Sequence, residues 1–250
     1  MNKTIQFSIA TNGYKRLFQP LIKSQQCYAA RCGYYYYCLD KTPWPITPSI
    51  AAWLKVRLIL KFMDLGYQRI FFVDADCSIA CSAPPIFSVI DLEYKPLWIA
   101  KGKSNTYNSG VVAVANTDIT KFFFRQLLDN GHNPVPIEDE APYENGHFIH
   151  YLNESKIAGE LEHNEWNNNS MLDPKSYIQH YSGGNLRKYY NSILAPKSAS
   201  LALKMAKIVS KFNTPSDKFK SATIGMQIDI LIEALAISKE YSKWIKGLSK

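Results

Sequence analysis

The sequence predicts an α/β fold: a mixed, mostly parallel sheet flanked by helices, followed by a helical C-terminal extension. The apolar run in Arg69–Cys77 ends abruptly in acids, as a strand covered on both faces would. Before it, two apolar strand segments each precede an amphipathic helical segment, the order typical of parallel sheets. After about residue 190, apolar residues recur at helical spacing.

Length and composition agree with one α/β domain that carries an appended piece. The chain has 250 residues, 46% of them hydrophobic and 20% charged, which is enough for a full core. No apolar stretch approaches the ~20 residues that span a bilayer, and Met1 leads into a strand rather than a signal peptide. Five cysteines, an odd number, favour reduced thiols. We therefore expect a cytoplasmic protein.

The net charge of +8 is unevenly placed along the chain. Residues 1–186 carry 17 basic and 17 acidic side chains, whereas residues 187–250 carry 12 basic and 4 acidic ones, so the tail holds the whole excess. A nucleic-acid surface would spread basic residues over the folded domain and mix them with aromatic side chains. We therefore expect no nucleic-acid partner.

The first half of the chain alternates strands and helices. Thr4–Thr11 is the first strand and Tyr34–Leu39 the second, because both are short and rich in β-branched or aromatic residues. Tyr14–Arg31 and Ile50–Leu65 have apolar residues at helical spacing, and Ser49 is the expected N-cap of the second helix. The strand in Arg69–Cys77 follows these two strand–helix units.

The end of that third strand is the strongest candidate for a binding site. Asp74 and Asp76 are two residues apart, so on a strand both carboxylates point to the same face. Like charges held so close favour a cation between them, and oxygen ligands suit Mg2+ or Mn2+. Open α/β sheets bind ligands beyond the carboxyl ends of their strands, which places this pair in a cleft.

The second half continues the same pattern and ends in helices. Pro96–Ala100 and the core of Asn108–Asn116 read as strands, and Asp118–Leu128 as an amphipathic helix. Ser176–Gly184 reads as a short strand that leads to a glycine turn. In the tail, two apolar helix faces are separated by Asn213–Ser216.

Four motifs together resemble the nucleotide-sugar glycosyltransferases of the GT-A fold, closest in pattern to the galactosyl- and xylosyltransferase branch. They are the Asp-Xaa-Asp at a strand end, the Trp53-Leu54-Lys55 on the preceding helix, the Asn108-Ser109-Gly110 before a strand, and the late His180 followed by Gly183. The resemblance covers about residues 4–190. It implies a Rossmann-like GT-A catalytic domain over residues 1–190, with a basic helical extension over residues 191–250 packed on it.

The resemblance also assigns roles to residues. It implies that Asp74, Asp76 and His180 hold Mn2+ or Mg2+. Glu144 matches the family's acid near the reacting sugar carbon, although Asn145 stands where the family has Gln, and Glu140 is a second candidate for the catalytic carboxylate. The residues implied in donor binding are Ala10, Thr11, Asn12, Lys55, Asp74, Ala75, Asn108, Ser109, Gly183, Arg187 and Lys188.

The implied function is metal-dependent transfer of a sugar from a UDP- or GDP-linked donor to an acceptor hydroxyl, such as that of a glycan. The basic tail is a candidate for peripheral contact with an acidic membrane surface. An ordinary solvated helix face is the alternative for the tail, and also for Lys55.

Two other functions use the same acids. Haloacid-dehalogenase phosphatases also end an apolar strand in Asp-Xaa-Asp, and Ser78 nearly fits their pattern, but they carry the motif on a very early strand and require a downstream acid pair after another apolar strand. That reading also leaves His180 without a role. A catalytically inactive sugar-nucleotide-binding module is the non-enzyme alternative. Asp74 and Asp76 could also be two solvated acids of a loop with no binding role.

Overall fold

A computed structural model describes residues 3–237, and its centre is a six-stranded sheet. The strand order is β2-β1-β3-β6-β5-β7, and only β6 runs against the other five. The sheet is therefore mixed and mostly parallel, which confirms the predicted fold class. Its strands are β1 (Thr4–Ile9), β2 (Tyr35–Leu39), β3 (Arg69–Val73), β5 (Leu97–Lys101), β6 (Tyr107–Ala115) and β7 (Ala158–Leu161).

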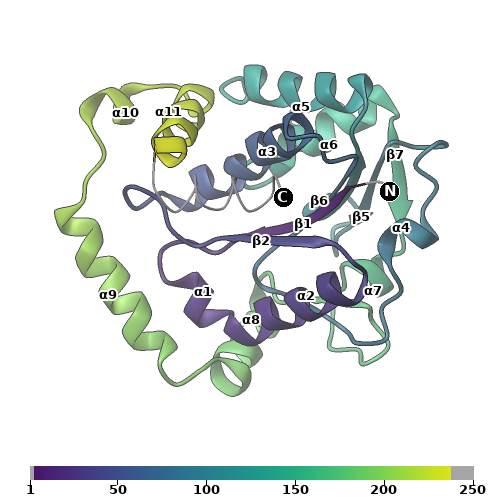
Figure 1. The fold of residues 1–250 in the computed structure, drawn as a ribbon, viewed down its shortest axis with the longest axis horizontal. Helices are drawn as coiled ribbons and strands as arrows, with labels where there is room; N and C mark the ends of the chain where they lie inside the picture. Colours follow the sequence, from purple (N-terminus) through teal and green to yellow (C-terminus); the bar gives the residue numbers. More distant parts are fainter. Residues whose placement is uncertain (1–2, 238–250) are drawn as a thin grey trace.

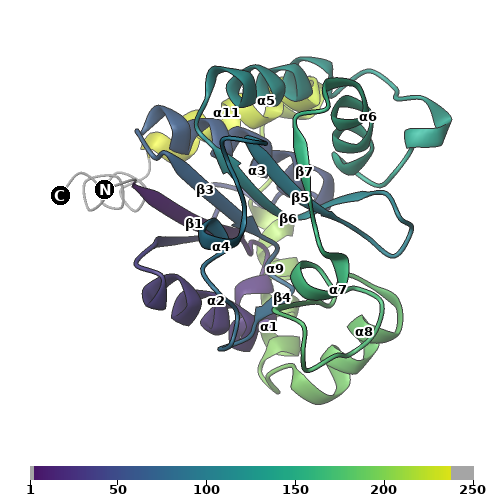
Figure 2. The same ribbon diagram turned by 90° about the vertical axis from the view of Figure 1, so that its right-hand side faces the viewer.

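Helices cover both faces of this sheet (Figures 1 and 2). One face carries α3 (Pro48–Asp64), α5 (Asp118–Asn130), α6 (Asn145–Ser155) and α11 (Ile224–Ile237). The other face carries α1 (Tyr14–Leu17) and α2 (Gln19–Arg31). The shorter elements are α4 (Ile86–Val89), η1 (Ile137–Asp139), α7 (His163–Trp166), α8 (Gly184–Tyr189), η2 (Tyr190–Leu194) and α10 (Asp217–Ser221).

Strand β3 is buried on both faces, as its apolar run predicts. Ile70 and Phe72 belong to the hydrophobic core under α3, and Phe71 and Val73 belong to the core on the α2 side. Alternate side chains of one strand thus enter two separate cores. Two such layers hold the carboxyl end of β3, and the acids that follow it, in a fixed place.

A second, two-stranded sheet extends the first beyond the carboxyl end of β3. It consists of β4 (Cys77–Ile79) and the antiparallel β8 (Ile178–His180), with Cys77 opposite His180. This pairing carries His180 to the Asp74–Asp76 segment, about a hundred residues earlier in the chain.

The predicted helix boundaries were close but not correct everywhere. The segment Tyr14–Arg31 forms two helices that are separated at Phe18, because Pro20 lies in the first turn of the second helix. The predicted N-cap Ser49 is wrong: α3 begins at Pro48, and the side chain of Thr47 accepts the hydrogen bond from the Ile50 amide.

The tail packs on the sheet domain at two places. α11 enters the main core through Ile228, Leu231 and Leu235. α9 (Ala199–Phe212) lies along one side of the molecule and touches α1, with Ala199 buried there (Figure 1). Residues 238–250 of the expected extension lie outside the described residues. Within the described part of the chain, no helix combines the length and the hydropathy needed to cross a bilayer.

Candidate active site

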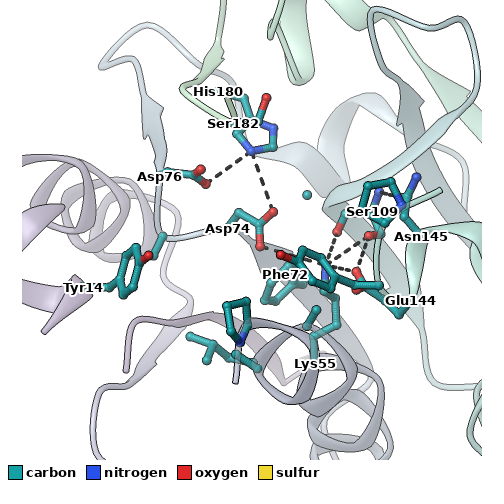
Figure 3. Close-up of a pocket in the computed structure, with 18 of the residues that line it drawn as sticks. Tyr14, Lys55, Phe72, Asp74, Asp76, Ser109, Glu144, Asn145, His180 and Ser182 are labelled. Atoms are coloured by element: carbon teal, nitrogen blue, oxygen red, sulfur yellow. Dashed lines mark hydrogen bonds and ion pairs between the residues drawn. The ribbon is translucent and has the colours of Figure 1, made fainter. Parts of the chain in front are cut away.

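A pocket of about 460 Å³ opens at the carboxyl ends of β1 and β3 (Figure 3). Its walls also include the N-terminal half of α3, the start of β6 and the segment that leads into α6. Asp74, Asp76 and His180 line one end, and Lys55 and Glu144 line the other. The strand-end position agrees with the general location of ligand sites in open α/β sheets.

The acids leave β3 in a tight turn. The Cys77 amide donates to the Asp74 carbonyl oxygen at 3.0 Å, which closes the turn around Ala75 and Asp76. His180 faces both carboxylates: its Nε2 lies 3.2 Å from Asp76 Oδ1 and 3.8 Å from Asp74 Oδ2. His180 therefore lies beside both acids, as the sequence predicts, although the residues whose possible ligand atoms all lie within 4.8 Å of one another are Asp76, Cys77 and His180.

The other nitrogen of His180 is fixed by a chain of amides. The Gly110 amide donates to Asn108 Oδ1, so this oxygen is the acceptor for Asn167 Nδ2 at 2.9 Å. The remaining oxygen of Asn167 then accepts from His180 Nδ1 at 2.7 Å. In the neutral imidazole, Nε2 thus carries the lone pair and aims it at the carboxylates, the arrangement that metal-ligating histidines share.

Two observations bear on whether these side chains could hold a divalent cation. Gly110 packs directly against them, since a Cβ there would lie only 2.9 Å from Asp74 Oδ2 and 2.5 Å from His180 Cε1, so a larger residue would displace the acid and the imidazole. The donors are carboxylate oxygens and an imidazole nitrogen, a set suited to Mn2+. The Cys77 sulfur is also nearby, but burial raises the pKa of its thiol well above the usual value, so it stays neutral.

The pKa values of the two acids shift in opposite directions. Desolvation raises the pKa of Asp74 to about 6; Lys55 opposes this rise and the charge of Asp76 adds to it. Burial also acts to raise the pKa of Asp76, but His180 and the ion pair with Arg187 outweigh it and lower the value to about 2. Burial lowers the pKa of His180, yet the two acids raise it further than burial lowers it. The two acids therefore differ: His180 and Arg187 keep Asp76 ionised, whereas burial favours the protonated form of Asp74.

Lys55 lies buried at the opposite end of the pocket, and not on a solvated helix face. Its Nζ lies 2.6 Å from Glu144 Oε1, 3.0 Å from both the carbonyl and hydroxyl oxygens of Ser109, and 3.9 Å from Asp74 Oδ1. The Ser109 hydroxyl donates to the same Glu144 oxygen at 2.6 Å. Burial lowers the pKa of Lys55, but Asp74 and Glu144 raise it more, so the ammonium keeps its charge.

Arg187 closes the acid end. Its guanidinium pairs with Asp76 Oδ2, and its Nε donates to the Tyr181 carbonyl oxygen at 2.6 Å. The guanidinium carbon lies 4.9 Å from the centre of the Phe18 ring, within the range of a cation–π contact.

The structure brings most of the predicted site residues together and leaves a few outside. Those that line the pocket are Thr11, Asn12, Lys55, Asp74, Ala75, Asp76, Asn108, Ser109, Glu144, His180 and Arg187. Ala10 is buried behind the wall, and its amide donates to the Leu39 carbonyl oxygen. Glu140 is exposed just after η1, and Gly183 and Lys188 do not reach the lining.

Sequence reasoning missed several residues of the site. Tyr14 and Tyr143 form parts of the rim, and Tyr143 has a positive φ of 61°, a conformation that is uncommon for a residue with a side chain. Tyr14 follows the Asn12-Gly13 turn, so its place after a strand end was the available signal. Asn167 and Gln25 gave no signal, because a single amide residue has no sequence pattern.

The fold was compared with known proteins. No protein-family model and no curated protein matches the sequence. Solved structures do match: a glycosyltransferase involved in the glycosylation of the major capsid of PBCV-1 has a TM-score of 0.58 at 15% identity, over 76% of this chain and 98% of that one.

Two further glycosyltransferases give similar results. The glycosyltransferase GlyE of Streptococcus pneumoniae has a TM-score of 0.51 at 14% identity, over 87% of this chain and 66% of that one. The galactosyltransferase LgtC, crystallised with donor and acceptor sugar analogues, has a TM-score of 0.50 at 13% identity, over 87% of this chain and 99% of that one. Together with the mixed sheet and its covering helices, these matches show that the chain has the GT-A fold of nucleotide-sugar glycosyltransferases.

Proposed function

We propose that this protein is a metal-dependent glycosyltransferase that moves a sugar from a nucleoside-diphosphate sugar to an acceptor hydroxyl. The observation that carries the proposal is the position of His180 Nε2, 3.2 Å from Asp76 and 3.8 Å from Asp74, at one end of a pocket on a GT-A fold. Fold alone would not be sufficient, because one fold hosts many functions.

The metal site would use Asp74, Asp76 and the Nε2 lone pair of His180. Mn2+ or Mg2+ bound there would offset the negative charge that develops on a departing nucleoside diphosphate. Thr11, Asn12 and Tyr14 lie on the same pocket wall and would contact the nucleoside, since an aromatic ring and short polar groups suit a base and a ribose. UDP- and GDP-linked donors are the candidates.

Lys55 and Arg187 would be the cations of the donor site. Arg187 pairs with Asp76, so a cation that bound to Asp76 would free the guanidinium for a phosphate oxygen. Lys55 is held by Glu144 and reaches toward Asp74 between the two ends of the pocket. It would stabilise negative charge without moving, which favours catalysis by preorganised electrostatics.

Glu144 is the better placed of the two candidate catalytic carboxylates. It lines the pocket, whereas Glu140 is exposed outside it, so the geometry favours Glu144 of the two candidates. A base must be within hydrogen-bond reach of the proton that it takes. The acceptor would bind near Pro142 and Tyr143 at the rim, and a glycan hydroxyl is the acceptor that we propose.

A donor screen tests this function. Purified protein is mixed with UDP- and GDP-sugars in the presence of Mn2+, Mg2+ or excess chelator, and release of the nucleoside diphosphate is measured. We expect release for a subset of donors, and none with chelator or with Asp76→Ala. Full activity in chelator would contradict metal dependence. Hydrolysis of a simple phosphate ester, with no release from any donor, would favour the phosphatase alternative.

We also propose that α9 contacts an anionic membrane surface. Its outward face carries a stripe of exposed apolar side chains, and exposed lysines flank that stripe, the pattern of a helix that lies in a membrane interface. The stripe consists of Leu201, Met205, Ile208, Val209 and Phe212, and the lysines are Lys204, Lys207 and Lys211.

Co-sedimentation with vesicles tests this contact. Wild-type protein should bind phosphatidylglycerol vesicles at low salt and be released by high salt. Phe212→Ser should weaken binding, whereas Phe122→Ser, which changes an exposed phenylalanine on α5, should not. Absence of wild-type binding at low salt would reject the contact.

A further inference from the structure

A buried amide lies directly behind the turn that carries the two acids. Gln25 on α2 is fully buried, and its Nε2 donates to the Asp74 carbonyl oxygen at 2.9 Å and to the Cys77 carbonyl oxygen at 2.8 Å. These two carbonyls stand at the two ends of the Asp74–Cys77 turn. One carboxamide thus ties together both ends of the segment that presents Asp74 and Asp76.

The orientation of this amide is determined by its surroundings. With the amide reversed, Gln25 Oε1 would face two carbonyl oxygens, which donate nothing. In the observed orientation Oε1 accepts from the Ser8 hydroxyl at 2.5 Å and from the Tyr36 hydroxyl at 3.2 Å. The Ser8 hydroxyl also contacts the Val73 carbonyl oxygen at 2.7 Å, so it shares its one proton between two acceptors.

A neighbouring glutamine shows that this arrangement is specific. Gln6 on β1 is as deeply buried as Gln25, but neither of its side-chain polar atoms has a hydrogen-bond partner among the described residues. Gln25, in contrast, uses both ends of its amide. A buried polar group in a full network fixes local geometry more firmly than apolar packing does.

We propose that Gln25 is a positioning residue for the active site: it holds the Asp74–Cys77 turn in the shape that lets both carboxylates and His180 reach one cation. The proposal builds on the function proposed above, because it assumes that the acids bind a metal. At the turn, the side chain of Gln25 bonds to backbone carbonyls and not to the carboxylates themselves, so it would act through the geometry of the acids and not on the substrate.

The test replaces Gln25 by methionine, which has a similar volume but donates no hydrogen bond. Amide hydrogen exchange of residues 74–77 is measured without metal, and Mn2+ affinity is measured by calorimetry in the presence of a nucleoside diphosphate. We expect Gln25→Met to exchange at least tenfold faster in this turn and to bind Mn2+ at least tenfold more weakly, at a temperature where the variant is folded by circular dichroism.

Gln6→Met is the matched control, because it changes the same residue type at the same burial without touching the turn. It should leave both the exchange rate and the Mn2+ affinity at wild-type values. Unchanged exchange in a folded Gln25→Met would overturn the proposal, and so would faster exchange with wild-type Mn2+ affinity. If wild-type protein binds no Mn2+, the proposed function fails, while the exchange comparison still shows whether Gln25 holds the turn.

Discussion

At one end of the pocket Lys55 and Glu144 neutralise each other, whereas at the other end Asp74 and Asp76 face one another across a single imidazole. The Lys55 end is closed: its ion pair is buried and reinforced by Ser109. At the acid end, burial raises the pKa of Asp74 to about 6, although Lys55 lies 3.9 Å from one of its oxygens, while His180 and Arg187 lower the pKa of Asp76 to about 2. The first end thus holds a buried ion pair, and the second holds one carboxylate whose charged form burial disfavours.

The largest expected effect is on the free energy of unfolding, and it comes from removing the acid of the Lys55–Glu144 ion pair. Glu144→Leu leaves the Lys55 ammonium buried with only the more distant Asp74 as an acidic neighbour, which should destabilise the fold by about 3–5 kcal/mol in chemical denaturation. The double variant Lys55→Met with Glu144→Leu should recover most of that loss, because it removes the buried ammonium together with its closest carboxylate. If Glu144→Leu lowers the free energy of unfolding by less than about 1 kcal/mol, the Lys55–Glu144 pair behaves as a solvent-exposed ion pair and not as a buried one.

The next effect concerns metal binding at the acid end. His180→Ala and Asp76→Ala should each weaken Mn2+ binding about 10–100-fold in calorimetry with a nucleoside diphosphate present. Because both side chains would serve one ion, the double variant should be little worse than the worse single variant. Strictly additive losses would show that the two residues act separately, and wild-type affinity in His180→Ala would reject the assembled site.

A smaller effect should appear when no metal is present. The folded pKa of Asp74, about 6, is above the ~3.9 of an unfolded chain, so ionising it costs folding free energy at pH above 6. Asp74→Asn should therefore stabilise the protein in chelator at pH 7.5, by about 1 kcal/mol after allowance for its partly exposed side chain. Below pH 4, where Asp74 is protonated in both states, the gain should vanish. A variant that is less stable than wild type at pH 7.5 would contradict a raised pKa for Asp74 in the folded protein.

The smallest effect should come from Glu140, which lies outside both ends of the pocket. Glu140→Ala should change the free energy of unfolding by less than about 0.5 kcal/mol, as surface substitutions usually do. Donor turnover should stay within about twofold of wild type, in contrast to Glu144→Gln measured beside it. A large loss of turnover in Glu140→Ala would move the catalytic carboxylate away from Glu144.

Patterns within one segment predicted the fold and the acid end well. The four consecutive apolar residues of β3 predict a strand buried on both faces. The two acids that follow them form a motif within the same short segment, so the sequence alone identifies them. The start of α3 was predicted less well, because Thr47 and Ser49 both have side chains that can cap a helix. Pro48, with its fixed φ, takes the first helical position, which makes Thr47 the N-cap. The resemblance to GT-A enzymes supplied His180, which no local pattern would have selected.

The closed end could not be predicted in the same way. Lys55 is on a helix whose sequence suits a solvated face equally well, and Glu144 lies in a loop almost ninety residues later. Their pairing depends on how α3 and the start of α6 meet over β6, which side-chain periodicity does not encode. The roles of Asn167 and Gln25 could not be predicted for the same reason. Asn167 contacts the ring of His180 and Gln25 contacts the backbone of Cys77, and both partners are distant in the sequence.

Because β4 pairs with β8, the site can assemble only late in synthesis, after β8 has left the ribosome. A ribosome releases the Asp74–Asp76 segment long before Ile178–His180, so the early chain has two acids at a strand end and no imidazole to join them. Domains fold largely from the N-terminus during synthesis, and contacts between distant segments form late. Nascent chains arrested before residue 178 should therefore lack His180, and with it the arrangement of Asp74, Asp76 and His180 that we propose as a metal site.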